Sequence, residues 1–433
     1  MLDLATTSLP GPGNIATQTL DNGLRVLVRE NHNSPSLVLA GYLPGGAVLE
    51  TPEQAGLSAF TASLLLRGTA TRSFEQINEA VDAAGASLSI YSGRHTVGFE
   101  GKALAEDFSL LLDVLADALQ RPVFPAEHVE RVRGQRLTAL QERDHDTQAV
   151  ASMLFHQLAY PAGHPYSRPL DGFRATIGEL TRAHLVEFYQ RSYGPAGGVL
   201  VVVGDVPSND VLAQVEAALG GWRAQPALAS RFPEVASPTG IVRQEQVLAG
   251  KTQVDSVLGA PALRRTDPDY YAARLADTVL GRFGMMGRLG ENVREQLGLA
   301  YYAYSALEAS REPGAWTVVA GVDPVNVERC LAAVTHEIAR LGAELVSEEE
   351  LNDCKAFLVG SLPLRLETNG GVAQTILDMV WYDLGLDYLQ RYGDLINSLR
   401  AEQVRSATAR YLRPDAYALA IAGAASEGSA QES

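Results

Sequence analysis

The sequence predicts an α+β protein made of two tandem homologous α/β-sandwich domains. Its 433 residues, 46% of them hydrophobic, are too many for one ordinary core and favour two or more domains. The same order of strand-like and helix-like segments occurs twice along the chain. Leu180 matches Leu399 and Gly204 matches Gly423, and both pairs are separated by 219 residues. A constant offset between distant positions indicates an internal repeat.

Local signals predict the elements of the first copy. Asn22-Gly23 lies between two strand-like runs in residues 17–30 and is typical of a hairpin with a type I′ turn. Ser73 and Gln76 have the spacing of a capping box, which begins a helix. The remaining expected elements follow in order: a strand at 36–43, a helix beginning at 56, strands within 86–103, amphipathic helices at 107–120 and 128–142, and a buried strand at 197–206.

The second copy repeats this series, with a strand at 315–323 and helices at 327–341 and 347–362. We therefore expect an N-terminal domain at 1–222 and a C-terminal domain at 243–425. Residues 223–242 are rich in Pro, Ala and Ser and are expected to be a linker. Residues 426–433 are expected to be a disordered tail.

Composition excludes several classes of function. The formal net charge is −16 and there is no Lys/Arg run, which argues against nucleic-acid binding. Cys330 and Cys354 have no metal-ligand spacing, so we expect reduced, buried thiols. The N-terminal stretch 1–14 lacks the pattern of a signal peptide, and no apolar run approaches the ~18 residues of a membrane span. We expect a soluble, cytoplasmic protein.

Several motifs resemble one known family. These are LDNGLRV at 20–26, the Gly45-Gly46 pair, the frame GLSAFTASLLLRGT at 56–69, His-Pro-Tyr at 164–166, and VREQLGLAYYAYS at 293–305. Together they resemble the insulinase/pitrilysin superfamily of inverted-motif zinc metallopeptidases, in its processing-peptidase-like branch. The resemblance covers nearly the whole chain. It implies a clam-shell dimer of two-domain subunits.

In active members of that family the first helix carries H-x-x-E-H, in which two His bind zinc and the Glu activates the bound water. The resemblance places the first His at Ala59, the Glu at Ala62 and the second His at Ser63. It places the third zinc ligand, which comes from a later helix, at Ala139. Neither an alanine nor a serine side chain offers the ligand atoms that zinc prefers. We call these residues the four vacated positions, and we expect no metal in this chain.

The second copy keeps two residues that the family uses. Arg294 and Tyr301 match a pair that, in the family, binds the substrate carbonyl and stabilises the oxyanion in the partner's zinc site. Both side chains are hydrogen-bond donors suited to that task. The alternative is that Arg294 pairs with Glu291 or Glu295 on a solvated face and that Tyr301 is an ordinary strand aromatic. The glycine-rich segment 281–290 resembles one thought to guide substrate, and a tight turn is an equal alternative.

The resemblance therefore implies a non-catalytic subunit of a heterodimeric zinc metallopeptidase. A homologous H-x-x-E-H partner would hold the zinc and cleave peptides or unfolded segments, while this chain would supply Arg294 and Tyr301. The alternatives are a structural core-type subunit or a peptide-binding protein with the same fold and no role in proteolysis. No nucleic acid or membrane partner is expected.

Overall fold

The computed structural model describes residues 9–224 and 232–425. The predicted tail at 426–433, the first eight residues of the N-terminal stretch and part of the predicted linker lie outside this range. The described chain forms two compact units. Unit 1 contains residues 9–140, 169–224 and 363–391, and unit 2 contains residues 141–168, 232–362 and 392–425. Within the described ranges, no helix is both long and apolar enough to cross a membrane.

Each unit contains one mixed sheet. The five strands of the second sheet follow the topology of five strands of the first, which has β1 in addition. The first has the order β1-β2-β6-β3-β5-β4 and the second β7-β11-β8-β10-β9. The β2–β6 and β7–β11 pairs are parallel, and the other pairs are antiparallel. The strands of the first sheet are β1 (Ala16–Thr19), β2 (Arg25–Glu30), β3 (Ser36–Pro44), β4 (Ser87–Ser92), β5 (Thr96–Leu104) and β6 (Val199–Gly204). Those of the second are β7 (Val242–Val247), β8 (Val254–Pro261), β9 (Ala300–Leu307), β10 (Ala315–Val322) and β11 (Ala418–Gly423). The repeat predicted from the sequence is therefore a repeat of structure.

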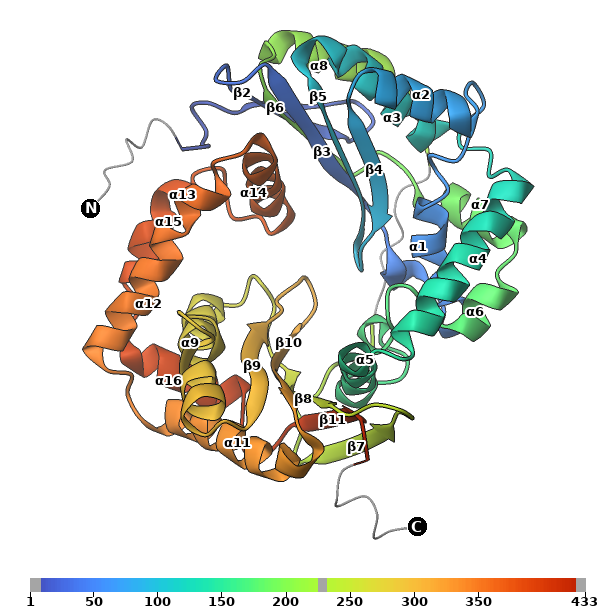
Figure 1. Ribbon diagram of the computed structural model, residues 1–433. Helices are drawn as coiled ribbons and strands as arrows, with labels where there is room; N and C mark the ends of the chain where they lie inside the picture. Colours follow the sequence, from blue (N-terminus) through green and yellow to red (C-terminus); the bar gives the residue numbers. More distant parts are fainter. Residues whose placement is uncertain (1–8, 225–231, 426–433) are drawn as a thin grey trace. The chain divides into compact units, whose positions relative to one another are not determined.

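The helices of unit 1 cover both faces of its sheet, and Figure 1 shows α2, α3 and α8 gathered on one of them. They are α1 (Leu57–Ala62), α2 (Phe74–Ala83), α3 (Phe108–Gln120), α4 (Ala126–Arg143), α6 (Arg174–Glu179), α7 (Arg182–Ser192), α8 (Ser208–Leu219) and α14 (Asn369–Trp381). Those of unit 2 are α5 (Thr147–Ala159), α9 (Tyr270–Gly281), α10 (Gly287–Leu289), α11 (Val327–Ala343), α12 (Glu348–Gly360) and α16 (Ala401–Tyr411). α13 (Leu362–Arg365) and α15 (Tyr388–Asn397) lie where the chain passes from one unit to the other.

The two copies exchange one helix. α5 lies among the first copy's helices in sequence, between α4 and α6, yet it packs on β8 and β11 of the second sheet. α14 comes from the second copy and packs on β3 and β6 of the first sheet. In the shared strand order, β8 corresponds to β3 and β11 corresponds to β6. The two helices therefore occupy equivalent places, each on the sheet of the other copy. The compact units are therefore not simple halves of the chain.

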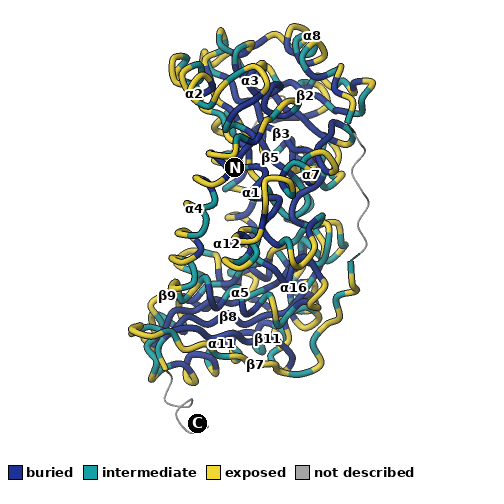
Figure 2. Tube along the Cα trace, turned by 90° about the vertical axis from the view of Figure 1, so that its right-hand side faces the viewer, coloured by how far each residue is buried: buried dark blue, intermediate teal, exposed yellow. Residues whose placement is uncertain are grey.

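Burial follows the sheets. In Figure 2 the central strands of each sheet are mostly buried and the helices expose one side. β6 and β11 are buried along their full length. Both end in a glycine, Gly204 with φ 155° and Gly423 with φ 144°. A Cβ atom at Gly204 would lie 2.5 Å from the Cα of Leu37, so the neighbouring strand requires glycine there.

Two local predictions are tested directly. The capping box at α2 is confirmed, because Ser73 Oγ accepts from Gln76 N and Gln76 Oε1 accepts from Ser73 N. The hairpin of β1 and β2 is also confirmed, but its predicted type I′ turn is wrong. That turn needs positive φ at both central residues, and of Asn22 and Gly23 only Gly23 has it. Gly23 N instead donates to Leu20 O at 2.9 Å, which closes a β-turn over residues 20–23. Gly23, the last residue of this turn, has the left-handed φ of 86°.

Candidate functional site

The N-terminal end of α1 is built by a buried carboxylate. Gly56 precedes the helix with φ 92°, and a Cβ atom there would lie 2.6 Å from the Asp171 carbonyl oxygen. Glu50 accepts hydrogen bonds from Gly56 N at 3.0 Å and Ser58 N at 2.6 Å. These contacts satisfy amides that a helix leaves open at its N-terminus, where negative charge is favourable. The N-terminal end of α1 is therefore held in a specific position by Glu50.

The four vacated positions lie on the two helices where the resemblance places them, but they offer no metal ligands. Ala59 and Ala62 are buried in α1. Ser63 ends α1, and its hydroxyl donates to Phe60 O at 2.7 Å. Ala139 is exposed on α4. In the described residues, no cluster of three or more His, Cys, Asp or Glu side chains could hold a metal ion. A zinc ion does not fit this residue set.

A cation lies beside the vacated positions. Arg136 of α4 donates through Nη2 to the carbonyl oxygen of Ala59, and its Nη1 lies 3.6 Å from Asp171 Oδ1. Arg133 and Arg136 both lie over the Phe60 ring, with Cζ 5.5 and 5.6 Å from its centroid. Burial lowers the pKa of the Arg136 guanidinium, and the charge of Asp171 opposes this shift. The positive charge of Arg136 would repel a zinc ion placed beside it, so it is a second reason why zinc does not fit here.

Arg136 was not identified from the sequence. Its position three residues before Ala139 puts it one turn away on the same helix. Only the contact with the Ala59 carbonyl shows that it reaches α1.

Arg294 lies in an unusual helix of unit 2. Residues Gly290–Gln296 form a π-helix, labelled η5, and Leu297 N donates to Asn292 O at 3.1 Å. Short π-helical segments occur frequently at functional sites. Arg294 is half-buried, and its side chain makes no ion pair or hydrogen bond with another residue in the described ranges. The alternative, in which Arg294 pairs with Glu291 or Glu295, is therefore not observed.

Tyr301 lies at an irregular point of the edge strand β9. Ala300 is opposite Val322 and Tyr302 is opposite Gly321, so Tyr301 is the extra residue of a β-bulge. Bulges redirect side chains and are common beside active sites. The Tyr301 side chain is 63% exposed. No hydrogen bond or ring contact joins it to the rest of the described chain.

The neighbouring tyrosines of β9 differ from Tyr301. Tyr302 donates to the buried carboxylate of Asp255, and Tyr304 Oη accepts from Gln148 Nε2 at 2.9 Å. Both rings pack against the core cluster formed by α5 and the second sheet. Burial, followed by the hydrogen bond to Asp255, raises the pKa of Tyr302. The strand-aromatic alternative therefore describes Tyr302 and Tyr304, while Tyr301 is available for other contacts.

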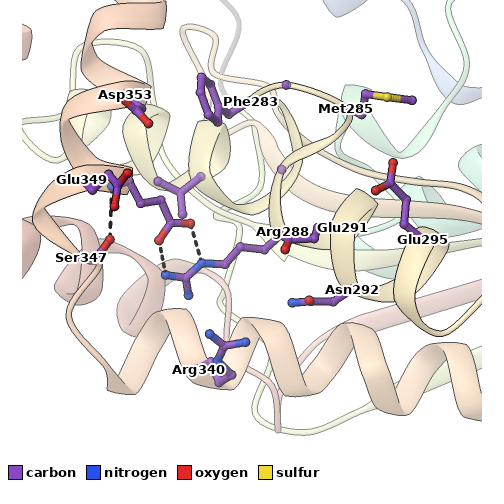
Figure 3. Close-up of a pocket in the computed structure, with 14 residues that line it drawn as sticks. Phe283, Met285, Arg288, Glu291, Asn292, Glu295, Arg340, Ser347, Glu349 and Asp353 are labelled. Carbon is purple, nitrogen blue, oxygen red and sulfur yellow. Dashed lines mark hydrogen bonds and ion pairs between the residues drawn. The ribbon is translucent and has the colours of Figure 1, made fainter.

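The glycine-rich segment is compact. Gly287 has φ 60°, and a Cβ atom at Gly290 would lie 1.8 Å from Met285 O. Directly after this turn, Arg288 of α10 forms a two-point hydrogen bond with Glu350 at the start of α12, with distances of 2.8 and 2.7 Å (Figure 3). This pair lies in a cavity of about 660 Å³. It ties the segment immediately before η5 to the start of α12. Whether the turn guides substrate stays a prediction.

Comparisons with known proteins agree with these observations. The model described as "Insulinase (Peptidase family M16)" matches residues 25–171, and "Peptidase M16 inactive domain" matches residues 179–358. A zinc protease of Mycobacterium tuberculosis, described as uncharacterized, is 30% identical over 354 residues, covering 81% of this chain and 80% of that protein. A probable mitochondrial-processing peptidase subunit beta of Arabidopsis thaliana is 24% identical and covers 83% of this chain and 68% of that protein.

Solved structures show the same architecture. A peptidase M16 inactive domain from Pseudomonas fluorescens has a TM-score of 0.87 at 26% identity, covering 95% of this chain and 98% of that one. A protease from Helicobacter pylori has a TM-score of 0.88 at 18% identity, with 96% and 100% covered, which bears on the fold alone. This chain belongs to the M16 (insulinase) peptidase family. It is a non-catalytic member, related to zinc proteases.

Proposed function

We propose that this chain is the non-catalytic subunit of a two-chain zinc metallopeptidase. Its partner is a homologous subunit with an intact H-x-x-E-H helix, which binds the zinc ion and carries the general base. The two subunits close around a chamber in which peptides or unfolded segments are cleaved. This chain contributes Arg294 and Tyr301, which bind the substrate carbonyl and stabilise the negative charge that develops on it.

One observation carries the proposal. The vacated α1 has no donor set for zinc, yet Arg294 and Tyr301 are both retained, both placed by irregular backbone, and both unengaged within the described residues. Irregular backbone costs stability and persists where the surrounding structure supports it, often at functional sites. Glu291 and Glu295 lie on the same element as Arg294, yet neither forms an ion pair with it.

The experiment is to tag this chain in its own cell, purify it gently and identify what co-purifies. A stoichiometric partner of similar length that contains H-x-x-E-H supports the proposal, and the mixture should cleave unfolded peptides in a zinc-dependent way. Recovery of this chain alone, or of a membrane assembly, would instead favour a peptide-binding homodimer or a structural core subunit.

A further inference from the structure

A small aromatic pocket lies within unit 1, and none of the four vacated positions lines it. It has a volume of about 230 Å³ and is formed by residues of β3, β4, β5 and α14. Four aromatic side chains and one carboxylate line it: Tyr42, Tyr91, Trp381, Tyr382 and Asp378. Because drug-sized ligands need pockets of about 300 Å³ or more, this one suits a single side chain or a small molecule.

The floor of the pocket is a row of residues across three strands. Tyr42 of β3 is opposite Gly98 of β5, and Gly98 is opposite Tyr91 of β4. Residues directly opposite each other share one face of the sheet. A Cβ atom at Gly98 would lie 2.4 Å from the Tyr91 ring, so the ring lies over the glycine. Because Gly98 has no side chain, the Tyr91 ring can lie across β5, the strand between Tyr91 and Tyr42.

The wall of the pocket is α14, which packs on β3 and β6. The Trp381 ring meets Tyr42 edge to face, with centroids 4.9 Å apart and an interplanar angle of 73°. One turn earlier on the helix, Asp378 Oδ1 accepts from Gln374 Nε2 at 3.0 Å. This bond orients the carboxylate beside the aromatic rings.

These groups favour a cation. The faces of aromatic rings carry negative electrostatic potential and attract ammonium and guanidinium groups, most strongly at tryptophan. A carboxylate at the same pocket adds a charge-assisted hydrogen bond. An anion would meet repulsion from both the rings and Asp378.

We propose that this pocket binds an organic cation, a guanidinium or alkylammonium group, between the aromatic rings and Asp378. The source is either an arginine or lysine side chain of a bound peptide or a free amine. Only the peptide source rests on the proposed function, because the pocket is complete within unit 1 and binding does not need the partner subunit.

The test is calorimetric titration of the full chain with N-acetylarginine amide, its neutral near-isostere N-acetylcitrulline amide, and spermidine. We expect the arginine probe or spermidine to bind at least about tenfold more tightly than the citrulline probe, since the charge is the main difference. Preference for the arginine probe indicates a peptide side chain, and preference for spermidine indicates a free amine. Equal binding of the charged and neutral probes, or binding of none, would overturn the proposal.

Variants locate the binding. Trp381→Leu and Asp378→Asn should each weaken binding by about tenfold. Gly98→Ala should weaken it too, because the new methyl group displaces the Tyr91 ring without removing any aromatic or charged group. Asp383→Asn is the matched control. Asp383 is exposed just after α14, outside the pocket, and its positive φ of 52° suits asparagine. Asp383→Asn should bind as the wild type does. If the three pocket variants, each folded by circular dichroism, also bind as the wild type does, the cation binds elsewhere and the assignment is wrong.

Discussion

The different roles of Tyr301 and Tyr302 can be tested by replacing each with phenylalanine, because this substitution removes only the hydroxyl group. Tyr302 donates to Asp255, which is 2% exposed and also accepts from Thr147. Tyr302→Phe removes a hydrogen bond to a charged group, typically about 1.5–3 kcal/mol. Tyr301→Phe removes a hydroxyl that has no partner in the described structure, so the free energy of unfolding should change by less than about 0.5 kcal/mol.

Urea unfolding measures the difference. With a slope of about 2–3 kcal/mol per molar urea, a loss of about 2 kcal/mol moves the midpoint of unit 2 down by roughly 0.7–1 M. Tyr301→Phe should leave the midpoint unchanged while lowering peptide cleavage in the reconstituted pair. Equal destabilisation by both substitutions, or a stable Tyr302→Phe variant, would refute the assignment of Tyr302 to packing and Tyr301 to contacts outside this chain.

Three further predictions follow from the described contacts. The first concerns a restored zinc site, with His, Glu, His and Glu at the four vacated positions. This variant should bind zinc at least about tenfold more tightly when Arg136→Gln is added, because a guanidinium near the ion is unfavourable. Competition with a chromophoric chelator measures the two affinities, and equal values would show that Arg136 has no such effect. Burial raises the pKa of Cys330 to about 11 and of Cys354 to about 12. Thiol reagents at pH 8 should therefore react only after unfolding, and stability should decline as pH rises from about 8.5, where unfolded thiols ionise, towards these folded values; rapid reaction of the native chain would contradict this. Gly204→Ala should destabilise unit 1 by more than about 1 kcal/mol. A methyl group at Gly178 in α6 would meet no atom within 4 Å, so Gly178→Ala should stabilise the unit by up to about 1 kcal/mol in thermal unfolding. A change of the same sign in the free energy of unfolding for both variants would be inconsistent with the close approach of the strands at Gly204.

The architecture was largely predictable because its signals are local or periodic. The constant offset between Gly204 and Gly423 corresponds to two strands that end in the same way in two sheets of one topology. The capping box at Ser73 needs only residues within one turn. The exchange of α5 and α14 was not predictable, because both helices are compatible in sequence with either equivalent sheet.

The candidate site could be read from the sequence only in part. The family resemblance led us to predict the vacated positions and the pair Arg294 and Tyr301, and their roles stay predictions. The sequence could not show the guanidinium of Arg136 on the Ala59 carbonyl, because that contact joins two helices far apart in the chain. Likewise the bulge at Tyr301 depends on the register between β9 and β10, and neither strand alone encodes it.

The central claim is that this chain supplies a substrate-binding pair to another subunit's zinc site. The most direct test is to measure peptide cleavage by the reconstituted pair with wild-type chain and with Arg294→Ala. The substitution should leave assembly intact, since Arg294 has no partner in the described chain, and should lower kcat by about 100- to 1,000-fold, as loss of one oxyanion-stabilising donor does. Arg329→Ala serves as a control for the loss of an arginine, because Arg329 is exposed on α11 and its side chain also has no partner in the described chain. Unchanged cleavage by a fully assembled Arg294→Ala pair would contradict the claim.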